Sequence, residues 1–312
     1  MAARLLAPLG SVYAWAVARR LAEAEPYRPA IPVICVGNIV AGGAGKTPVV
    51  MALGARLKRG GRQVHLLTRG YGGTEAGPRA VDPVRHDAAR VGDEALLLAA
   101  CAPTWVARWR PDGAVAATEM GADILVMDDG FQNPSLAKDL SLVVVDGAYG
   151  FGNGRTIPAG PCRESIAAGL ARADAVVLMG EDKTGAARWF GDLPVLSARL
   201  VAGPEAETFR GRKVVAFAGI GRPAKFFDTL EGCGAQLVGA HSFPDHHAYS
   251  RAELTELIAE AERQGALLAT TAKDAVRVPS DLRPHLAVLT VRLVWDNPET
   301  VDALLDRVDS RL

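Results

Sequence analysis

A glycine-rich turn carries the side chains with the clearest chemical meaning. The apolar run at residues 31–36 indicates a buried parallel strand, because both of its faces would need to be covered. A turn with three glycines follows, then Lys46 and Thr47, then a helical pattern over 49–57. Strand, glycine turn, lysine with hydroxyl, and helix in this order are typical of a phosphate-binding loop. The residues predicted to contact phosphate are Val40, Ala41, Gly42, Gly43, Ala44, Gly45, Lys46 and Thr47.

The chemistry of such a loop predicts ATP and Mg²⁺ as ligands. Main-chain N–H groups close on phosphate oxygens, and the helix N-terminus adds the positive end of its dipole. Lys46 would contact the β- and γ-phosphates, and the Thr47 hydroxyl would ligate Mg²⁺. The complete pattern has a glycine where this chain has Val40. The alternative interpretation is a glycine-rich turn with a surface lysine.

A pair of aspartates predicts the metal-binding half of the same site. The apolar strand at 124–127 ends in Asp128 and Asp129. An acid at the end of a strand, downstream of a phosphate loop, is the second element of a nucleotide-hydrolysing site. Asp128 would hold Mg²⁺ directly or through water, and Asp129 would position the metal or the acceptor. The alternative is a pair of turn aspartates after a strand.

Asp93, before the predicted helix at 95–100, has two possible roles. Aspartate is a favoured N-cap, and capping is the simpler explanation. A carboxylate held at a helix start near a transferred phosphate can also act as general base on a hydroxyl. The residues alone favour the cap.

Three of the six histidines lie within one loop, at His241, His246 and His247. A zinc site is one interpretation, but no cysteine is near and the helical i, i+4 spacing is missing. An ordered loop that faces an interdomain cleft, with one imidazole serving the chemistry, fits better.

Two other loops have the composition of ligand-binding segments. Arg69 and Tyr71 lie in a glycine-rich turn after a predicted strand, where open α/β sheets bind ligands, although an exposed turn tyrosine explains it as well. The long loop at 150–164 is rich in glycine and stiffened by two prolines, which is typical of a binding loop. Its Arg155 and Arg163 are candidate phosphate clamps or solvated surface arginines.

The elements that position these residues predict an α/β fold of two domains. Strands alternate with helices up to about residue 178, which predicts a doubly wound, mostly parallel sheet of the P-loop NTPase type. The composition is loop-like over 180–212, and a β-α-β-α-β pattern over 214–270 predicts a second, smaller α/β domain. We place the P-loop kinase-like domain at 29–205 and the smaller domain, closing over the cleft, at 206–312.

Residues 1–28 are predicted to form a separate amphipathic helix. The apolar stretch from Leu5 to Ala18 is shorter than the ~20 residues that span a bilayer. A signal peptide is unfavourable, because Arg19 and Arg20 directly follow the candidate cleavage site and the phosphate loop needs cytosolic ATP. A helix in the membrane interface and a helix packed on its own domain both remain open.

Composition excludes some classes of partner. The 312 residues are enough for two cores, and 35 basic and 35 acidic residues give no overall electrostatic footprint for nucleic acid. The four cysteines are widely separated, which indicates buried thiols in a reducing compartment rather than disulfides or zinc. We infer no nucleic-acid partner and no obligate protein partner.

Seven motifs together resemble those of the tetraacyldisaccharide 4'-kinase family, in the family's order and along nearly the whole chain. They are VGNIVAGGAGKTP, TRGYGG, VGDEALLLA, MDDGFQN, GFGNGRTIPAGPCRE, FPDHHAY and TTAKDAVR. The resemblance implies transfer of the ATP γ-phosphate to the 4'-hydroxyl of a tetraacyldisaccharide 1-phosphate, which forms the 1,4'-bisphosphate lipid A precursor, lipid IVA. It also implies a peripheral enzyme on the cytoplasmic face of the bacterial inner membrane, which favours the interfacial helix.

The resemblance further implies roles for single residues. Asp93 and His246 match a catalytic pair, which replaces the cap as the preferred role of Asp93. Asp93 would take the proton of the sugar hydroxyl, and His246 would orient Asp93 or raise its basicity. His247 leaves open which ring serves. Family members often carry Ser or Thr in place of Val40 and Ala44, so we expect at most weaker nucleotide binding. Lys46, Thr47, Asp128 and Asp129 match the nucleotide and metal positions, and the substrate or supporting positions are Arg69, Tyr71, Gln132, Asn153, Arg155, Arg163 and Glu164.

Two other functions fit parts of the sequence. A membrane-associated partitioning or positioning ATPase has a deviant loop with similar spacing, but its signature first lysine is Ala41 here. A soluble kinase for a small metabolite would need neither detergent nor the first helix.

Overall fold

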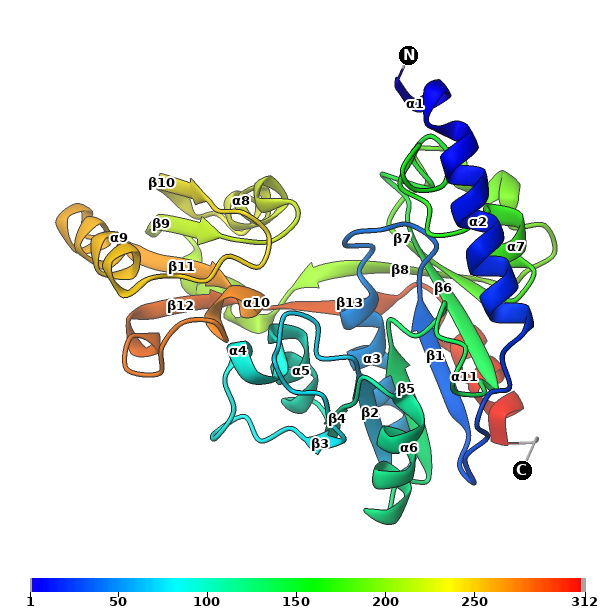
Figure 1. Ribbon diagram of the computed structural model, residues 1–312. Helices are drawn as coiled ribbons and strands as arrows, with labels where there is room; N and C mark the ends of the chain where they lie inside the picture. The colour runs from blue at the N-terminus through cyan, green and yellow to red at the C-terminus, as the bar shows by residue number, and fades with distance from the viewer. Residues whose placement is uncertain (1, 310–312) are drawn as a thin grey trace.

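The computed structural model describes residues 2–309, and its larger unit is built on a nine-stranded sheet (Figure 1). The strand order is β13-β8-β7-β6-β1-β5-β2-β4-β3, and only the outermost strands, β13 and β3, run antiparallel to their neighbours. This order confirms the predicted doubly wound, mostly parallel sheet. The strands are β1 (Val33–Gly37), β2 (Val64–Thr68), β3 (Arg79–Ala80), β4 (Thr104–Val106), β5 (Ile124–Asp128), β6 (Leu140–Asp146), β7 (Ala175–Met179), β8 (Val195–Ala202) and β13 (Val291–Trp295).

Helices cover both faces of this sheet, because successive side chains of a strand point to opposite faces. Ile34 of β1 packs in the core that α3 and α11 cover, and its neighbour Val33 packs in the core that α6 and α7 cover. Both faces are therefore buried, as the continuous apolar runs predicted. The helices are α3 (Lys46–Arg59), α4 (Ala88–Val91), α5 (Asp93–Ala99), α6 (Arg110–Glu119), α7 (Ile166–Leu170), α11 (Pro298–Asp309) and the 3₁₀ helix η1 (Ala186–Trp189).

A second, four-stranded parallel sheet forms the smaller unit, in the order β10-β9-β11-β12. Its two cores lie on opposite faces, with α8 in one and α9 in the other. The predicted second α/β unit is therefore present. Its elements are η2 (Pro204–Phe209), β9 (Lys213–Ala218), α8 (Pro223–Gly232), β10 (Gln236–Ser242), α9 (Arg251–Gln264), β11 (Leu267–Thr271), α10 (Ala272–Ala275), η3 (Arg283–His285) and β12 (Leu286–Leu289).

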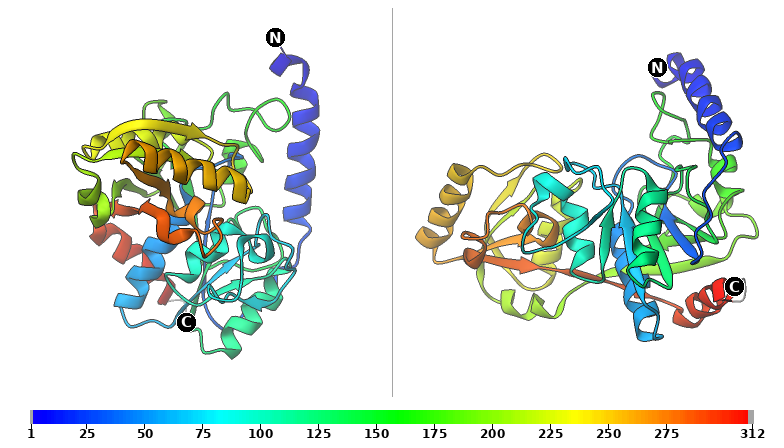
Figure 2. Two further views of the ribbon diagram at one scale, coloured as in Figure 1. Left: turned by 90° about the vertical axis from the view of Figure 1, so that its left-hand side faces the viewer. Right: turned by 60° about the horizontal axis from the view of Figure 1, so that its bottom comes forward.

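The predicted extent of the smaller domain, 206–312, is wrong at its C-terminal end. β13 pairs antiparallel with β8 at the edge of the large sheet, and α11 buries Val301 and Leu304 in the core beside α3. The smaller unit therefore ends near residue 290. The expectation of a loop at 180–212 also fails, because β8 forms there. Figures 1 and 2 show β8 and β13 side by side as a ribbon between the two units.

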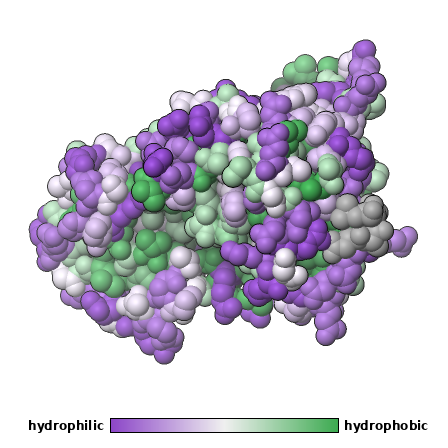
Figure 3. Space-filling model, turned by 90° about the horizontal axis from the view of Figure 1, so that it is seen from below, coloured by the Kyte–Doolittle hydropathy of each residue, from purple (hydrophilic) through white to green (hydrophobic). Residues whose placement is uncertain are grey.

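The two units meet around a hollow on the underside of the molecule. Figure 3 shows hydrophobic residues gathered in the part of this face that belongs to the smaller unit and the hollow. Mostly hydrophilic residues cover the rest of the face. The hollow marks the boundary between the units.

The N-terminal segment forms α1 (Ala2–Leu5) and α2 (Ala7–Ala22), and α2 projects along the outside of the larger unit (Figure 2). Of its residues, only Gly10 and Val17 are buried, and the Gly10 carbonyl accepts a hydrogen bond from the Thr156 hydroxyl at 2.7 Å. Leu9, Val12 and Trp15 are about 60% exposed. Within residues 2–309, no helix has the length and apolar character needed to cross a membrane.

Candidate active site

The glycine turn between β1 and α3 has the conformation of a phosphate cradle. α3 begins at Lys46, earlier than predicted, and its N-cap is Gly45 in the left-handed region, with φ of 87°. No side chain caps this end, so the first main-chain N–H groups of α3 lack a side-chain partner. A side chain at Gly45 would be strained at that φ, which explains the glycine. These amides and the dipole favour an anion at this end of the helix.

Asp129 lies between two cationic side chains, those of Lys46 and Arg163. The Lys46 Nζ lies 3.3 Å from Asn38 Oδ1 and 3.7 Å from Asp129 Oδ1. The Arg163 guanidinium donates to both carboxylate oxygens of Asp129, at 2.8 and 3.2 Å. Burial by itself would raise the pKa of Asp129, but Lys46 and Arg163 outweigh it and the pKa is lowered. Asp129 therefore remains ionised beside the cradle.

Asp128 has the properties of a metal ligand. It is buried at the end of β5, opposite Val36 of β1, and neither of its carboxylate oxygens has a hydrogen-bond partner. Burial, followed by the charge of Glu94, raises its pKa to about 7. A buried carboxylate without a partner is costly unless a cation binds it. A divalent ion therefore fits this position.

The type of metal that fits is Mg²⁺. Among the described residues 2–309, no three His, Cys, Asp or Glu side chains are grouped so that they could hold a metal by themselves. Mg²⁺ typically binds through one or two carboxylates together with waters and substrate phosphates. Thr47, in the first turn of α3, Asp128 and Asp129 are the residues that would hold it.

Substitution of Asp128 should stabilise the metal-free protein at alkaline pH. Its folded pKa of about 7 lies above the ordinary 3.8, so the folded state binds more protons between these values. Below about pH 4 the Asp128 carboxyl is protonated in both the folded and the unfolded state and costs no free energy of unfolding. As the pH rises from about 4 to 7, the free energy of unfolding falls, because the carboxylate ionises more readily in the unfolded state. Asp128→Asn removes that loss, which is on the order of a few kcal/mol.

Thermal unfolding in EDTA at pH 5 and pH 8 measures this effect. The midpoint of Asp128→Asn should exceed that of the wild type by several degrees at pH 8 and by less at pH 5. Asp228→Asn, on the exposed face of α8, is the matched control. An equal difference at both pH values would contradict the expectation.

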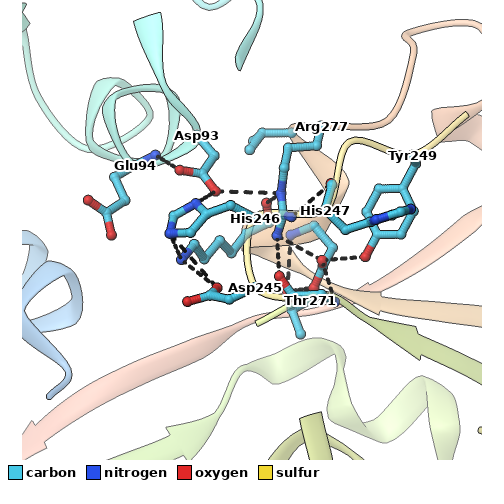
Figure 4. Close-up of polar contacts among 12 residues, drawn as sticks. Asp93, Glu94, Asp245, His246, His247, Tyr249, Thr271 and Arg277 are labelled. Carbon is cyan, nitrogen blue, oxygen red and sulfur yellow. Dashed lines mark hydrogen bonds and ion pairs between the residues drawn. The ribbon is translucent and has the colours of Figure 1, made fainter. Parts of the chain in front are cut away.

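Asp93 is the first residue of α5 and joins the larger unit to the smaller one. It is 3% exposed, and its Oδ1 accepts from the Glu94 main-chain N–H at 2.8 Å. Its Oδ2 lies 2.9 Å from His246 Nδ1 and 3.5 Å from Arg277 Nε (Figure 4). The predicted cap position is wrong, because Gly92 is the N-cap. Gly92 has a φ of 87°, and a Cβ there would lie 2.5 Å from the Tyr71 carbonyl oxygen.

His246, and not His247, faces Asp93. The His246 backbone has a left-handed φ of 60°, and its N–H donates to the Gly219 carbonyl at 3.1 Å. Its ring also meets the exposed Tyr71 edge-on, at 5.4 Å between ring centroids. His247 instead stacks on Phe243, and its Nε2 lies 3.1 Å from Glu253 Oε1. His247 thus belongs to the packing of the smaller unit.

Two charged residues at the site were not predicted from the sequence. Burial raises the pKa of Glu94, and the negative charges of Asp93 and Asp129 add to the rise. The positive charges of Lys273 and Lys46 oppose it. Because Lys273 belongs to the smaller unit and Lys46 to the larger, charges from both units act on Glu94. Its place beside Asp93 in the GDE motif was the available signal. Arg110 is buried, with its Nε unpartnered. Burial lowers the pKa of Arg110 to about 10 against the charges of Asp128 and Asp129, and no sequence pattern pointed to it.

Gln132 and Glu164 form hydrogen bonds that hold the backbone next to the cradle in place. The Gln132 amide donates to the Asn38 carbonyl at 2.8 Å and to Glu164 Oε1 at 2.9 Å. Glu164 is buried and pairs with Arg172, with 2.7 Å between Nη1 and Oε2. These contacts fix the backbone at Asn38, whose side-chain oxygen accepts a hydrogen bond from the Lys46 ammonium group.

The predicted binding loop is joined to the cradle at one end. The Ala41 N–H donates to the Pro161 carbonyl at 2.7 Å, and the Arg163 N–H donates to the Ile39 carbonyl at 2.7 Å. In the other half of the loop, the Asn153 amide donates to the Ala159 carbonyl at 2.9 Å, and its Oδ1 accepts from the Arg155 N–H at 3.1 Å. Asn153 thus shapes the loop itself. Arg69 lies close enough to Arg110 to lower its pKa.

Comparisons with known proteins agree over the length of the chain. A family model described as Tetraacyldisaccharide-1-P 4'-kinase matches residues 2–309. A tetraacyldisaccharide 4'-kinase of Paramagnetospirillum magneticum is 67% identical over 311 residues, which are 99% of this chain and 95% of that protein. One of Rhodospirillum centenum is 57% identical over 303 residues, 96% of this chain and 90% of that protein. The crystal structure of LpxK from Aquifex aeolicus in complex with ATP superposes with a TM-score of 0.82 at 26% identity and covers 99% of both chains.

Proposed function

The chain belongs to the tetraacyldisaccharide-1-P 4'-kinase family, and from this premise we propose that it transfers the γ-phosphate of ATP to the 4'-hydroxyl of a tetraacyldisaccharide 1-phosphate. The product is the 1,4'-bisphosphate lipid A precursor, lipid IVA. The observation that carries the proposal is the contact of Asp93 with His246 across the two units, at the edge of the sheet that holds the cradle. The ATP complex of the Aquifex aeolicus relative supports ATP as the donor.

The cradle binds the nucleotide and stabilises the charge that develops during transfer. Phosphoryl transfer needs little covalent chemistry from the protein, so positioning and electrostatics dominate. The N-terminus of α3 and Lys46 contact the β- and γ-phosphates, and Arg163 with Asp129 keeps Lys46 in place. Thr47, Asp128 and Asp129 would hold Mg²⁺, which would supply positive charge to the phosphate oxygens.

The Asp93–His246 pair accepts the proton that the sugar loses. The 4'-oxygen forms its bond to the γ-phosphorus while the bond from that phosphorus to the bridging oxygen of ADP breaks. The hydroxyl proton passes to the pair, whose net charge rises from minus one to zero. A positioned base of this kind contributes about 10²–10⁴ in rate. Asp93 is suited to this role because its Oδ1 accepts from the Glu94 N–H and its Oδ2 contacts the His246 ring, so the carboxylate is held in one orientation.

Contacts between the units exclude water from the transferred phosphate. Besides Asp93 and His246, the Arg222 guanidinium at the start of α8 pairs with the buried Asp146 at the end of β6, and Lys225 lies 4.0 Å from the same carboxylate. These pairs join the smaller unit to the carboxyl edge of the large sheet at two places. Closure of this kind prevents transfer of the phosphoryl group to water.

We also propose that the enzyme is a peripheral protein of the cytoplasmic face of the inner membrane and that its N-terminal helices bind there. Leu9, Val12 and Trp15 of α2 expose an apolar face, and Arg19 and Arg20 follow it. An amphipathic helix with basic residues binds at the interface of anionic lipids. The acylated acceptor is then reached from the membrane surface.

Polar substitutions on this face should weaken membrane binding. Burial of each side chain contributes about 1.5 kcal/mol or more, so the triple change of Leu9, Val12 and Trp15 to Ser should reduce binding to anionic phospholipid vesicles at least tenfold. Co-sedimentation measures it. A control triple change of Val84, Met120 and Val291, which are exposed apolar residues elsewhere, should leave binding unchanged. Equal losses in both variants would contradict the interfacial role.

The function is tested with [γ-³²P]ATP, Mg²⁺ and the tetraacyldisaccharide 1-phosphate in detergent micelles, followed by thin-layer separation. The label should move to the lipid, and ATP consumption should depend on the acceptor. ATP consumption at the same rate without lipid would indicate a partitioning-type ATPase instead. Phosphorylation of a small sugar without detergent would indicate a soluble metabolite kinase.

A further inference from the structure

Lys273 contacts the side of the His246 ring that faces away from Asp93. Its Nζ lies 3.1 Å from His246 Nε2. On the other side of the ring, His246 Nδ1 lies 2.9 Å from Asp93 Oδ2 (Figure 4). The imidazole is thus held at both nitrogens, by a carboxylate from the larger unit and an ammonium group from the smaller. None of the roles proposed above uses this lysine.

The two contacts select one protonation state of the ring. A lysine ammonium group can only donate, so Nε2 must accept and carries no proton. A carboxylate can only accept, so the ring proton lies on Nδ1. We infer that Lys273 is a positioning residue that holds His246 neutral with its proton on Nδ1. The Asp93–His246 pair then keeps the net negative charge with which it accepts a proton. This consequence for catalysis rests on the proposed function, but the tautomer does not.

Lys273 is fixed by its surroundings. It lies in α10, a short helix capped by Thr271, whose hydroxyl accepts from the Asp274 N–H at 3.1 Å. Its carbonyl accepts from Arg277 Nε at 3.1 Å, and its Nζ lies 3.4 Å from Asp245 Oδ1. Its side chain is 22% exposed. A lysine held in this way is a directed donor rather than a solvated surface charge.

The charges that face His246 come from three segments. The Asp93 carboxylate from α5 favours the protonated ring. Arg277 Nε lies 3.5 Å from Asp93 Oδ2, and its positive charge reduces that effect. Asp245, 3.8 Å from Nε2, also favours protonation, and Lys273 opposes it. Tyr71 contributes an uncharged ring. Loss of the lysine therefore leaves two carboxylates near the imidazole, with only Arg277 against them.

The direct test is ¹⁵N NMR of the full chain labelled at histidine, without substrate. His246→Gln identifies the His246 signals by their loss. The wild type should show a protonated Nδ1 and an unprotonated Nε2 at pH 7. Lys273→Met should show imidazolium or a mixture of tautomers at that pH. Lys213→Met, at the opposite end of the smaller sheet, is the matched control and should leave the signals unchanged.

The kinetic test is the pH dependence of kcat for the lipid acceptor. Lys273→Met should move the acidic limb upward by about one pH unit, which lowers kcat roughly tenfold on that limb, with the KM for ATP unchanged. Lys273→Arg keeps the positive charge and the hydrogen-bond donor, so the acidic limb of this variant should lie close to that of the wild type. Asp245→Asn should move the limb the opposite way.

Three results would overturn the inference: a wild-type spectrum with the proton on Nε2, a Lys273→Met spectrum and limb identical to the wild type, or a raised KM for ATP with an unmoved limb. The last result would make Lys273 a phosphate ligand. If the wild type forms no phosphorylated lipid, the proposed function fails, while the spectra still decide the role of Lys273.

Discussion

Asp93→Asn lowers kcat for the lipid acceptor by about 10²–10⁴, while the dissociation constant for ATP stays within about threefold of the wild type. The substitution keeps the shape of the side chain but removes the charge that receives the hydroxyl proton. We expect ATP binding to depend on the cradle between β1 and α3, whereas the Asp93 carboxylate contacts Glu94, His246 and Arg277. Steady-state kinetics with the lipid acceptor, together with calorimetric titration of ATP, separates the two effects.

The controls address folding and specificity. Asp112→Asn changes an acid in the first turn of another helix, α6, and should leave kcat unchanged. Because Asp93 is buried against Arg277, its loss also affects stability, so unfolding midpoints are measured for each variant. His246→Gln should reproduce the fall in kcat with less effect on the midpoint, since that ring is more exposed. Normal turnover in folded Asp93→Asn would remove Asp93 from the role of base.

Lys46→Met lowers kcat/KM for ATP by about 10²–10³, the second largest effect we expect. The Lys46 side chain is 12% exposed, and its ammonium group lies between Asn38 and Asp129 beside the glycine turn. Its loss removes positive charge where negative charge builds up during transfer. Pre-steady-state measurement of phosphoryl transfer at saturating ATP shows whether the loss persists in the chemical step.

Lys58→Met is the matched control, because Lys58 lies in the last turn of the same helix. It should cost only a few tenths of a kcal/mol in stability through the helix dipole and leave kcat/KM unchanged. A comparable kinetic loss in both variants would mean that α3 is disturbed as a whole, which would contradict a direct role for Lys46 at the phosphate.

The cradle could be predicted because its elements are contiguous. The apolar run of β1, the glycines that adopt left-handed conformations and the helix that starts at Lys46 lie within about thirty residues, and each follows from local propensity. The aspartates at the end of β5 were predictable for the same reason. A buried strand must end at the edge of the sheet, and parallel strands bring their carboxyl ends to one edge.

The sequence by itself determined the two α/β units, the phosphate loop and the acids near it, because these depend on periodicity and turn chemistry within short segments. The tertiary structure alone decided that β13 and α11 return to the large sheet. That return depends on pairing with β8, almost a hundred residues earlier in the chain. It also decided which histidine faces Asp93. His246 and His247 are neighbours, but the left-handed backbone of His246 turns its ring toward Asp93, 153 residues away. Such contacts depend on the packing of one unit against the other, which no local pattern records.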